Sequence, residues 1–167
     1  MSYHLAQLNI ARLLHPITDP RIQEFVHGLE PINGLADRSP GFAWRLQSDS
    51  GNATDVHHPW SEDPFLLVNM SVWESVEALA VFVYSGAHRQ VLRRRRRWFE
   101  RMAEAYTALW WIPRGHLPMT EEAEERVLRL RESGPTPYAF TLREHFPPPD
   151  VASSGPVSSP EEWTCPA

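Results

Sequence analysis

Cysteine is almost absent from this chain of 167 residues, because Cys165 is the only one. A single cysteine excludes an intrachain disulfide and leaves no basis for a cysteine-based metal site. No apolar run approaches the roughly 20 residues that span a membrane. The N-terminal residues MSYHLAQLNI lack a charged leader followed by a long apolar core, so they do not resemble a secretory signal. We therefore expect a cytoplasmic protein with no membrane partner.

Positive net charge is also missing, since the formal net charge is −5. This balance argues against a general nucleic-acid binder. The chain has no Gly-rich phosphate loop, Rossmann fingerprint or Gly-x-Ser-x-Gly elbow. His57 and His58 stand without a third ligand at a usual spacing, so we predict no metal site. Seven Trp and seven Phe, by contrast, favour a large apolar interior or an aromatic-lined pocket.

The stretch 65–102 is the most informative, since it reads as a strand followed by a helix. In the strand, residues of alternating position point to opposite faces. One face is wholly apolar and carries Leu66, Val68, Met70 and Val72. The other face is mixed and carries Leu67, Asn69, Ser71 and Trp73. We expect packed helices on the apolar face and a cavity or a partner on the mixed face.

The order of the expected elements indicates the fold. Strands are predicted at 3–12, 42–47, 65–74 and 106–112, and helices at 19–30, 75–84, 88–105 and 120–133. We expect Pro31 to interrupt the first helix, Thr120 to cap the last and Gly134 to end it. This is an α+β, ferredoxin-like βαββαβ pattern with an extra C-terminal helix, spanning residues 1–146. Residues 147–167 are predicted to be a Pro/Ser-rich disordered tail.

Several segments carry a resemblance to a known superfamily. A strand ending in Trp73-Glu74-Ser75, a helix opened by Glu-Ala-Leu and a later His resemble the antibiotic-biosynthesis monooxygenases, which are dimeric α/β barrels. The chain is similar to a bacterial domain-of-unknown-function family in that superfamily. The matching pieces are YHLAQLNIAR, SPGFAWRLQ, the 65–102 stretch, WWIPRGHLP and GPTPYAF. The resemblance implies a homodimer whose sheets pack face to face, because a sheet with helices on one face needs cover on the other.

The resemblance also implies site residues. In heme-degrading members the site combines an Asn on the first strand, an aromatic on the helix and a later His, which Asn9, Phe82 and His88 match here. Phe82 stands where those enzymes have Trp, and the spacing to His88 is shorter. His88 can act as a general base or ligate heme iron. A helix-start residue that bonds nearby backbone is the alternative.

The polar side chains of the mixed faces form a second group of candidates. If helices cover the apolar faces, then Gln7, Asn9, Asn69, Ser71 and Trp73 point toward the barrel side. Burying an amide without partners costs roughly 1–3 kcal/mol. These amides therefore either bond one another as a structural network or orient a ligand.

Aromatic and charged residues complete the candidates. Trp44, Trp73, Trp110 and Trp111 are candidates to line a pocket for a flat substrate, with core packing as the alternative. Trp110 and Trp111 are consecutive, so only one of them can face the barrel. His116 either reaches the barrel mouth or bonds locally in a turn, and Arg45 either pairs with an acidic ligand or is a surface charge. Arg93–Arg97 read as a solvated, salt-bridged face, with Arg93 or Arg97 able to turn toward an anionic ligand.

We thus predict a small-molecule enzyme of the monooxygenase-like type, with no cofactor and a mostly apolar or aromatic substrate held between sheet and helix. An isomerase- or cyclase-like reaction fits the same superfamily. The predicted catalytic residues are His88 and Asn9, and the predicted substrate-binding residues are Asn69, Trp73, Trp44, Phe82, Ser71, Trp110 and His116. The alternatives are a heme-binding protein with His88 or His116 on the iron, and a non-catalytic ligand-binding or stress protein.

Overall fold

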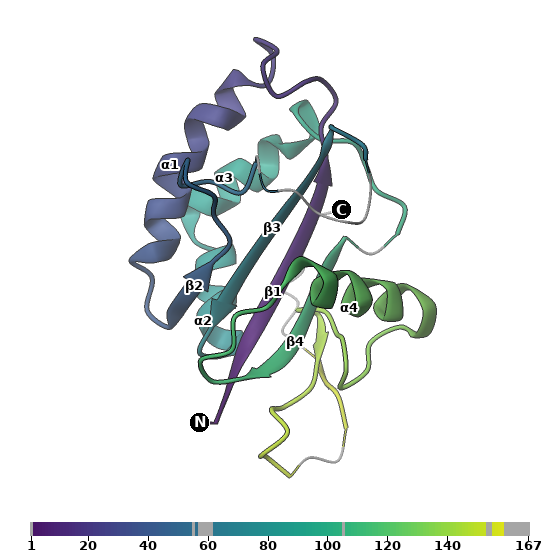
Figure 1. Cartoon of the computed structure of the whole chain (residues 1–167). Helices are drawn as coiled ribbons and strands as arrows, with labels where there is room; N and C mark the ends of the chain where they lie inside the picture. The colour runs from purple at the N-terminus through teal and green to yellow at the C-terminus, as the bar shows by residue number, and fades with distance from the viewer. Residues whose placement is uncertain (1, 55, 57–61, 105, 153–154, 159–167) are drawn as a thin grey trace.

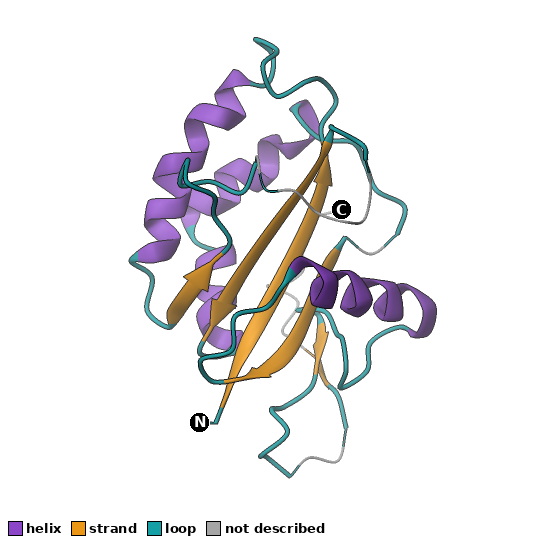
Figure 2. Ribbon diagram, in the orientation of Figure 1, coloured by secondary structure: helices purple, strands orange, loops and turns teal. Residues whose placement is uncertain are grey.

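Four antiparallel strands form the central sheet, in the order β2-β3-β1-β4. The computed structural model describes residues 2–54, 56, 62–104, 106–152 and 155–158. The strands are β1 Tyr3–Arg12, β2 Phe42–Arg45, β3 Leu66–Trp73 and β4 Thr107–Pro113. The helices are α1 Gln23–Asp37, α2 Val76–Val83, α3 Gly86–Arg94, the 3-10 turn η1 Arg95–Arg97, and α4 Thr120–Ser133. This confirms the ferredoxin-like α+β fold with an extra helix (Figures 1 and 2).

The two faces of the sheet carry different helices. On one face Leu5, Trp73 and Leu109 pack with Ala36 of α1 and Leu79 of α2. On the opposite face the alternate strand residues form a second core with α4, comprising Ala6, Leu8, Met70, Trp110 and Val127 among others. In Figure 1, α4 lies in front of the sheet, while α2 and α3 lie behind it.

The prediction that helices cover the apolar face holds for α4 but was wrong for α1 and α2. We expected the crossover helices on the face of Ala6, Leu8 and Met70, with the polar side chains pointing away from them. Instead α1 and α2 pack on the face that carries Gln7 and Ser71. Alternation along a strand says which residues share a face, but the handedness of the crossover connections decides which face the helices take.

The bounds of two helices also differ from the prediction. The first helix begins at Gln23 instead of Asp19, and it continues through Pro31 to Asp37. The third helix stops at Arg94 instead of continuing to residue 105. The chain after η1 pairs with the end of β1: Trp98 O accepts from Leu14 N at 2.8 Å and Glu100 N donates to Arg12 O at 2.8 Å. These backbone groups are therefore used in pairing and are not available to a helix.

The ends of α4 were predicted in part. Gly134 follows the helix with φ of 70°, the left-handed region that glycine adopts at little cost. The N-cap position is Met119, which has no side-chain capping bond, so the prediction that Thr120 caps the helix was wrong.

The segment after α4 returns along β4. Leu109 and Phe140 exchange two backbone hydrogen bonds, of 2.8 and 2.9 Å. A short pair follows, β5 Glu144–His145 with β6 Val157–Ser158. The predicted tail therefore includes described structure at 147–152 and 155–158, where Pro148 is buried; residues 159–167 lie outside the described residues.

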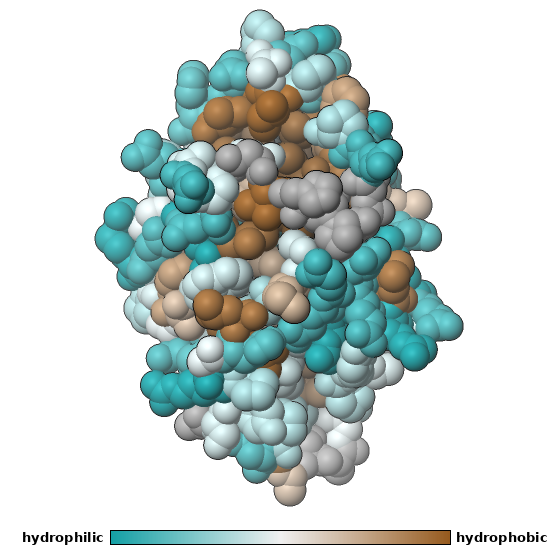
Figure 3. Space-filling view, viewed as in Figure 1, coloured by the Kyte–Doolittle hydropathy of each residue, from teal (hydrophilic) through white to brown (hydrophobic). Residues whose placement is uncertain are grey.

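The apolar face of the sheet is covered in part within one chain, since Trp44, Leu46 and Leu66 on it are only partly buried. Val68, Met70 and Val72 are buried there, and α4 packs onto β4. Figure 3 shows hydrophobic residues along the middle of this view, ringed by hydrophilic ones. A partner sheet would have to meet α4 as well, and the face-to-face homodimer stays a prediction. In the part of the chain that the structure describes, none of the helices has both the length and the apolar character to cross a membrane.

Candidate functional site

A cavity of about 960 Å³ lies on the side of the sheet covered by α1, α2 and α3. Its floor comes from β1, β3 and β4, and its walls come from the three helices and from Ala53 and Thr54 of the loop after β2. Most of its surface is apolar. Proteins typically bind small molecules in such cavities, with a few placed polar groups that fix orientation.

Strand register builds the polar floor. Asn9 of β1 stands opposite Asn69 on β3 and opposite Thr107 on β4. One pleat along, Gln7 stands opposite Ser71 and Leu109. The floor therefore carries two rows that run across the strands, one wholly polar and one mixed.

The amide oxygens of Gln7 and Asn9 accept hydrogen bonds, while their NH2 groups donate none among the described residues. Ser71 Oγ donates to Gln7 Oε1 at 2.7 Å, and Thr107 Oγ1 donates to Asn9 Oδ1 at 3.1 Å. Asn69 is exposed to the cavity. Among the described residues, no hydrogen bond uses the NH2 of Gln7 or Asn9, or either end of the Asn69 amide. The predicted alternatives thus coexist, since part of the network is internal and part is open to a ligand.

Aromatic rings close one end of the cavity. The rings of Phe42 and Trp73 meet edge to face at 5.3 Å, and Trp73 stacks on Phe82 at 5.1 Å. Trp73 is fully buried, and its Nε1 donates to Ser71 Oγ at 2.8 Å. This bond satisfies the indole N–H inside the core, and it is the partly exposed Phe82 that presents an apolar ring to the cavity.

His88 stands beside this aromatic group, with its ring 4.8 Å from that of Phe82. Its Nδ1 lies 2.9 Å from the carbonyl oxygen of Val83. A carbonyl only accepts, so Nδ1 carries the hydrogen and Nε2 of the neutral ring carries none. Burial lowers the pKa of His88 below its usual 6.5, against an opposing effect of the Val83 bond. The ring is therefore neutral at pH 7, with Nε2 available as a proton acceptor.

The structure brings most of the predicted site residues together. Those that line the cavity are Asn9, Asn69, Ser71, Trp73, Phe82 and His88. The prediction that all of the candidates share one pocket was wrong for three others. Trp44 and Trp110 lie in the core of the opposite face, since their strand positions alternate away from the cavity. His116 is in the turn after β4, where its Nε2 lies 2.8 Å from Glu122 Oε2.

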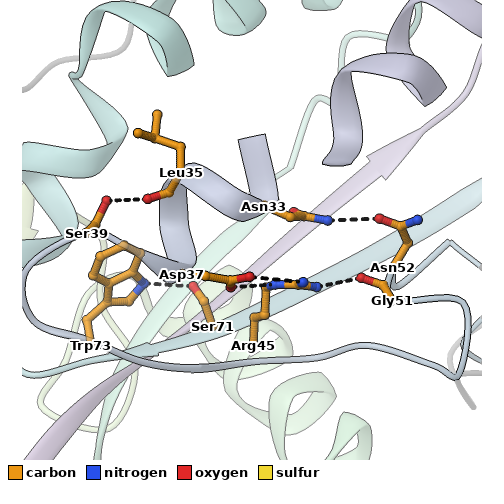
Figure 4. Close-up of polar contacts among 9 residues, drawn as sticks. All are labelled: Asn33, Leu35, Asp37, Ser39, Arg45, Gly51, Asn52, Ser71 and Trp73. Atoms are coloured by element: carbon orange, nitrogen blue, oxygen red, sulfur yellow. Dashed lines mark hydrogen bonds and ion pairs between the residues drawn. The ribbon is translucent and has the colours of Figure 1, made fainter. Parts of the chain in front are cut away.

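The guanidinium group of Arg45 is hydrogen-bonded to residues of this chain. Its Nε donates to Asp37 Oδ1 at 2.8 Å, and a terminal nitrogen donates to the Gly51 carbonyl at 2.8 Å (Figure 4). Beside it, Asn33 of α1 donates to Asn52 at 2.9 Å. These contacts tie α1 to the loop after β2 and close that edge of the cavity.

The three central arginines of the run Arg93–Arg97 line the cavity. Arg94, Arg95 and Arg96 line it, whereas Arg93 and Arg97, which we predicted as candidates to turn inward, do not. Tyr106 and Thr107 were missed altogether, although the alternation of Thr107 with Leu109 along β4 was a usable signal. Among the described residues, no group of three His, Cys, Asp or Glu side chains could hold a metal ion; His57 and His58 lie outside them.

A family model matches residues 4–155, which is most of the chain. The chain belongs to the family DUF3291, a domain of unknown function. No curated protein matches this DUF3291 chain.

Solved structures with a similar chain course include proteins of three bacteria. PA3566 of Pseudomonas aeruginosa is 12% identical, covering 70% of this chain and 98% of its own, with a TM-score of 0.45. Rv0793 of Mycobacterium tuberculosis is 14% identical, with 70% and 97% covered and a TM-score of 0.45. SnoaB, a cofactor-independent oxygenase of Streptomyces nogalater, is 13% identical, with 70% and 98% covered and a TM-score of 0.44. At these values the likenesses say nothing about the reaction or the substrate of this chain.

Proposed function

We propose that this DUF3291 protein is a small-molecule enzyme that holds a mostly apolar, flat substrate in the cavity and removes a proton from it with His88. The observation that carries the proposal is the combination in one cavity of a neutral His88 with the amide NH2 groups of Asn9 and Asn69. Among the described residues, neither His88 Nε2 nor these NH2 groups have a hydrogen-bond partner. Phe82, which is partly exposed and stacks on the buried Trp73, supplies the surface on which a flat molecule stacks.

These groups divide the chemistry between them. Nε2 of His88 accepts the proton of an acidic C–H or O–H, and the Val83 carbonyl steadies the imidazolium that forms, because it already accepts from Nδ1. Negative charge then develops on a substrate oxygen. The NH2 groups of Asn9 and Asn69 are placed to donate to that oxygen. Deprotonation is the first step shared by isomerisation, cyclisation and cofactor-independent oxygenation of such substrates.

The bare Nε2 of His88 also favours a second candidate, a heme protein. A histidine that ligates a metal generally donates its other ring N–H to a carbonyl or carboxylate, as Nδ1 does here to Val83. His88 is the residue that would hold the iron, since His116 lies outside the cavity and is bonded to Glu122. Bound heme would supply redox or oxygen chemistry. An absorption spectrum of the purified protein, with and without added heme, separates the two candidates through the Soret band.

The proton-transfer proposal is tested by solvent exchange. A panel of aromatic carbon acids and phenols is screened for binding by thermal shift, and exchange of the acidic C–H in D2O is followed by NMR for each compound that binds. His88→Gln keeps an NH2 that can donate to the Val83 carbonyl but has no basic nitrogen. It should bind ligand within a few-fold of wild type and slow the exchange about 100-fold or more.

His116→Gln is the matched control, because it removes an exposed histidine outside the cavity. It should leave exchange unchanged. Exchange that survives in His88→Gln would exclude His88 as the base. A ligand that binds without any catalysed exchange in the wild type would favour the non-catalytic reading.

A further inference from the structure

Gln7 is an amide of the cavity floor that the proposed chemistry does not use. It lines the cavity from β1 and stands opposite Ser71 on β3. Its Oε1 accepts from Ser71 Oγ at 2.7 Å. Ser71 Oγ in turn accepts from Trp73 Nε1 at 2.8 Å (Figure 4). Three side chains from two strands therefore form a chain of hydrogen bonds that ends at the cavity.

The direction of this chain of hydrogen bonds is set at its buried end. Trp73 is fully buried, and an indole N–H only donates. Ser71 Oγ accepts that hydrogen, so its own hydrogen needs another acceptor, and Ser71 is itself buried. The Gln7 amide supplies this acceptor only when its oxygen faces Ser71. The NH2 group of Gln7 is therefore held on the side away from Ser71.

The NH2 group of Gln7 is open to the cavity. Among the described residues, Gln7 Nε2 makes no hydrogen bond, and the only buried side-chain nitrogen or oxygen without a partner is Arg126 Nε. Gln7 Nε2 is therefore not buried, and since the residue lines the cavity, its two hydrogens are accessible from there. A ligand that covers this group without offering an acceptor leaves it without a hydrogen bond, which weakens binding.

Gln7 lies in a different row of the floor from the two asparagines. Gln7 and Asn9 share one face of β1 two residues apart, so their backbone positions are about 7 Å apart. Asn69 stands opposite Asn9, and Ser71 stands opposite Gln7. Trp73 is two residues beyond Ser71, so the Gln7 row lies between the aromatic end and the asparagine row. Side chains on a strand stand roughly perpendicular to the sheet, so the two rows can hold two separate ligand oxygens.

We infer that the ligand carries two hydrogen-bond-accepting oxygens about 7 Å apart, one bound by the amides of Asn9 and Asn69 and the other by the NH2 group of Gln7. The inference rests on the proposed function, because it names the chemical class of the same ligand. That class is a flat aromatic compound with a carbonyl oxygen at each end. Gln7 is a specificity-determining residue of the cavity, and Ser71 and Trp73 position its amide.

The test compares 1,4-diacetylbenzene with 4-isopropylacetophenone, in which an isopropyl group of similar shape replaces one acetyl group. Binding of each compound to the full chain is measured by ligand-observed NMR titration. The diketone should bind about fivefold or more tightly, because only the diketone offers an acceptor to both rows. An apolar pocket without the second donor would prefer the isopropyl compound, which has more apolar surface to bury.

Matched variants separate the Gln7 donor from the fold around it. Gln7→Met keeps the length of the side chain without the amide, so it should abolish the preference for the diketone and bind 4-isopropylacetophenone within about threefold of wild type. Gln7→Glu keeps an oxygen for Ser71, and at about pH 8 its carboxylate donates nothing, so it should also lose the preference. Gln47→Met is the control, because Gln47 is exposed and lies outside the cavity lining. It should keep the full preference.

Equal affinities of the two compounds for the wild type would overturn the inference and leave the proposed function standing. A preference that survives in both Gln7 variants would also overturn it, because another donor would then hold the second oxygen; so would loss of the preference in Gln47→Met. If other compounds of the aromatic panel bind but neither of these two does, the inference fails alone. If no compound of the panel binds, the proposed function fails and the inference fails with it.

Discussion

Replacing Gly41 by alanine should lower the free energy of unfolding by about 2–5 kcal/mol. Gly41 has φ of 79°, where an alanine pays about 1–2 kcal/mol for its Cβ. A Cβ built there would lie 2.6 Å from the Cβ of Ala78 on α2. Real Cβ atoms essentially never approach so closely, and forcing packed elements apart costs about 1–3 kcal/mol more.

Neither side of this contact can yield cheaply. Both atoms are Cβ atoms held directly by backbone, so no rotamer change separates them. Gly41 O accepts from Glu74 N at 2.7 Å, and Ala78 N donates to Ser75 Oγ at 3.1 Å. The start of β2 and the first turn of α2 are thus tied to the end of β3, where Phe42 and Trp73 close the cavity.

Urea unfolding at 25 °C measures the effect, with an unchanged m-value showing that the same surface is exposed. Gly51→Ala is the control, because Gly51 has φ of 81° and nothing within 4 Å of a built Cβ. It should lose only the backbone contribution of about 1–2 kcal/mol. Ala78→Gly removes the colliding atom, so the double variant should recover about 1–3 kcal/mol relative to additivity. Equal losses for Gly41→Ala and Gly51→Ala, or an additive double variant, would refute the reasoning.

Two other predictions concern pH and a buried indole. Because burial lowers the pKa of His88 below 6.5, the unfolded chain takes up this proton first as pH falls. The contribution of neutral His88 to the free energy of unfolding should be fully present above pH 6.5 and should be lost as the pH falls from there toward the pKa of the folded state. Urea unfolding curves between about pH 7.5 and 5 measure this loss, and His88→Gln should remove it. The same pH dependence in wild type and His88→Gln would contradict the prediction. Glu122→Ala should cost about 1–3 kcal/mol, because the buried Trp110 Nε1 would lose its acceptor at 2.8 Å. Glu122→Gln keeps a side-chain oxygen and should cost less than about 1 kcal/mol in the same assay, so equal losses would show that charge matters more than the indole bond.

The strands and the grouping of the floor residues were predictable because both are local properties. Alternation along β1 and β3 placed Asn9 with Gln7, and Asn69 with Ser71 and Trp73, and the structure keeps these groups. The same rule, applied to β4, would have excluded Trp110 and found Thr107. Choosing Trp110 came from weighing the residue type above its position on the strand.

Helix limits were less predictable, because distant segments decide them. Residues after Arg97 have helical composition, yet their backbone pairs with Leu14 and Arg12 at the end of β1. Pro31 is a strong local signal against a helix, yet α1 continues past it and packs Ala36 against the sheet. In both places tertiary contacts outweigh a preference that acts only on neighbouring residues.

The sequence by itself determined the ferredoxin-like order of elements and the two faces of each strand, since periodicity and turn residues act over a few positions. Only the tertiary structure decided that the crossover helices lie over the polar face, which turns a row of amides into the floor of a cavity. It also decided which members of a uniform run of arginines reach that cavity. Arg93–Arg97 are chemically identical, and the lining contains Arg94, Arg95 and Arg96 but not Arg93 and Arg97. The pairing of the chain after η1 with the end of β1 holds this segment in place.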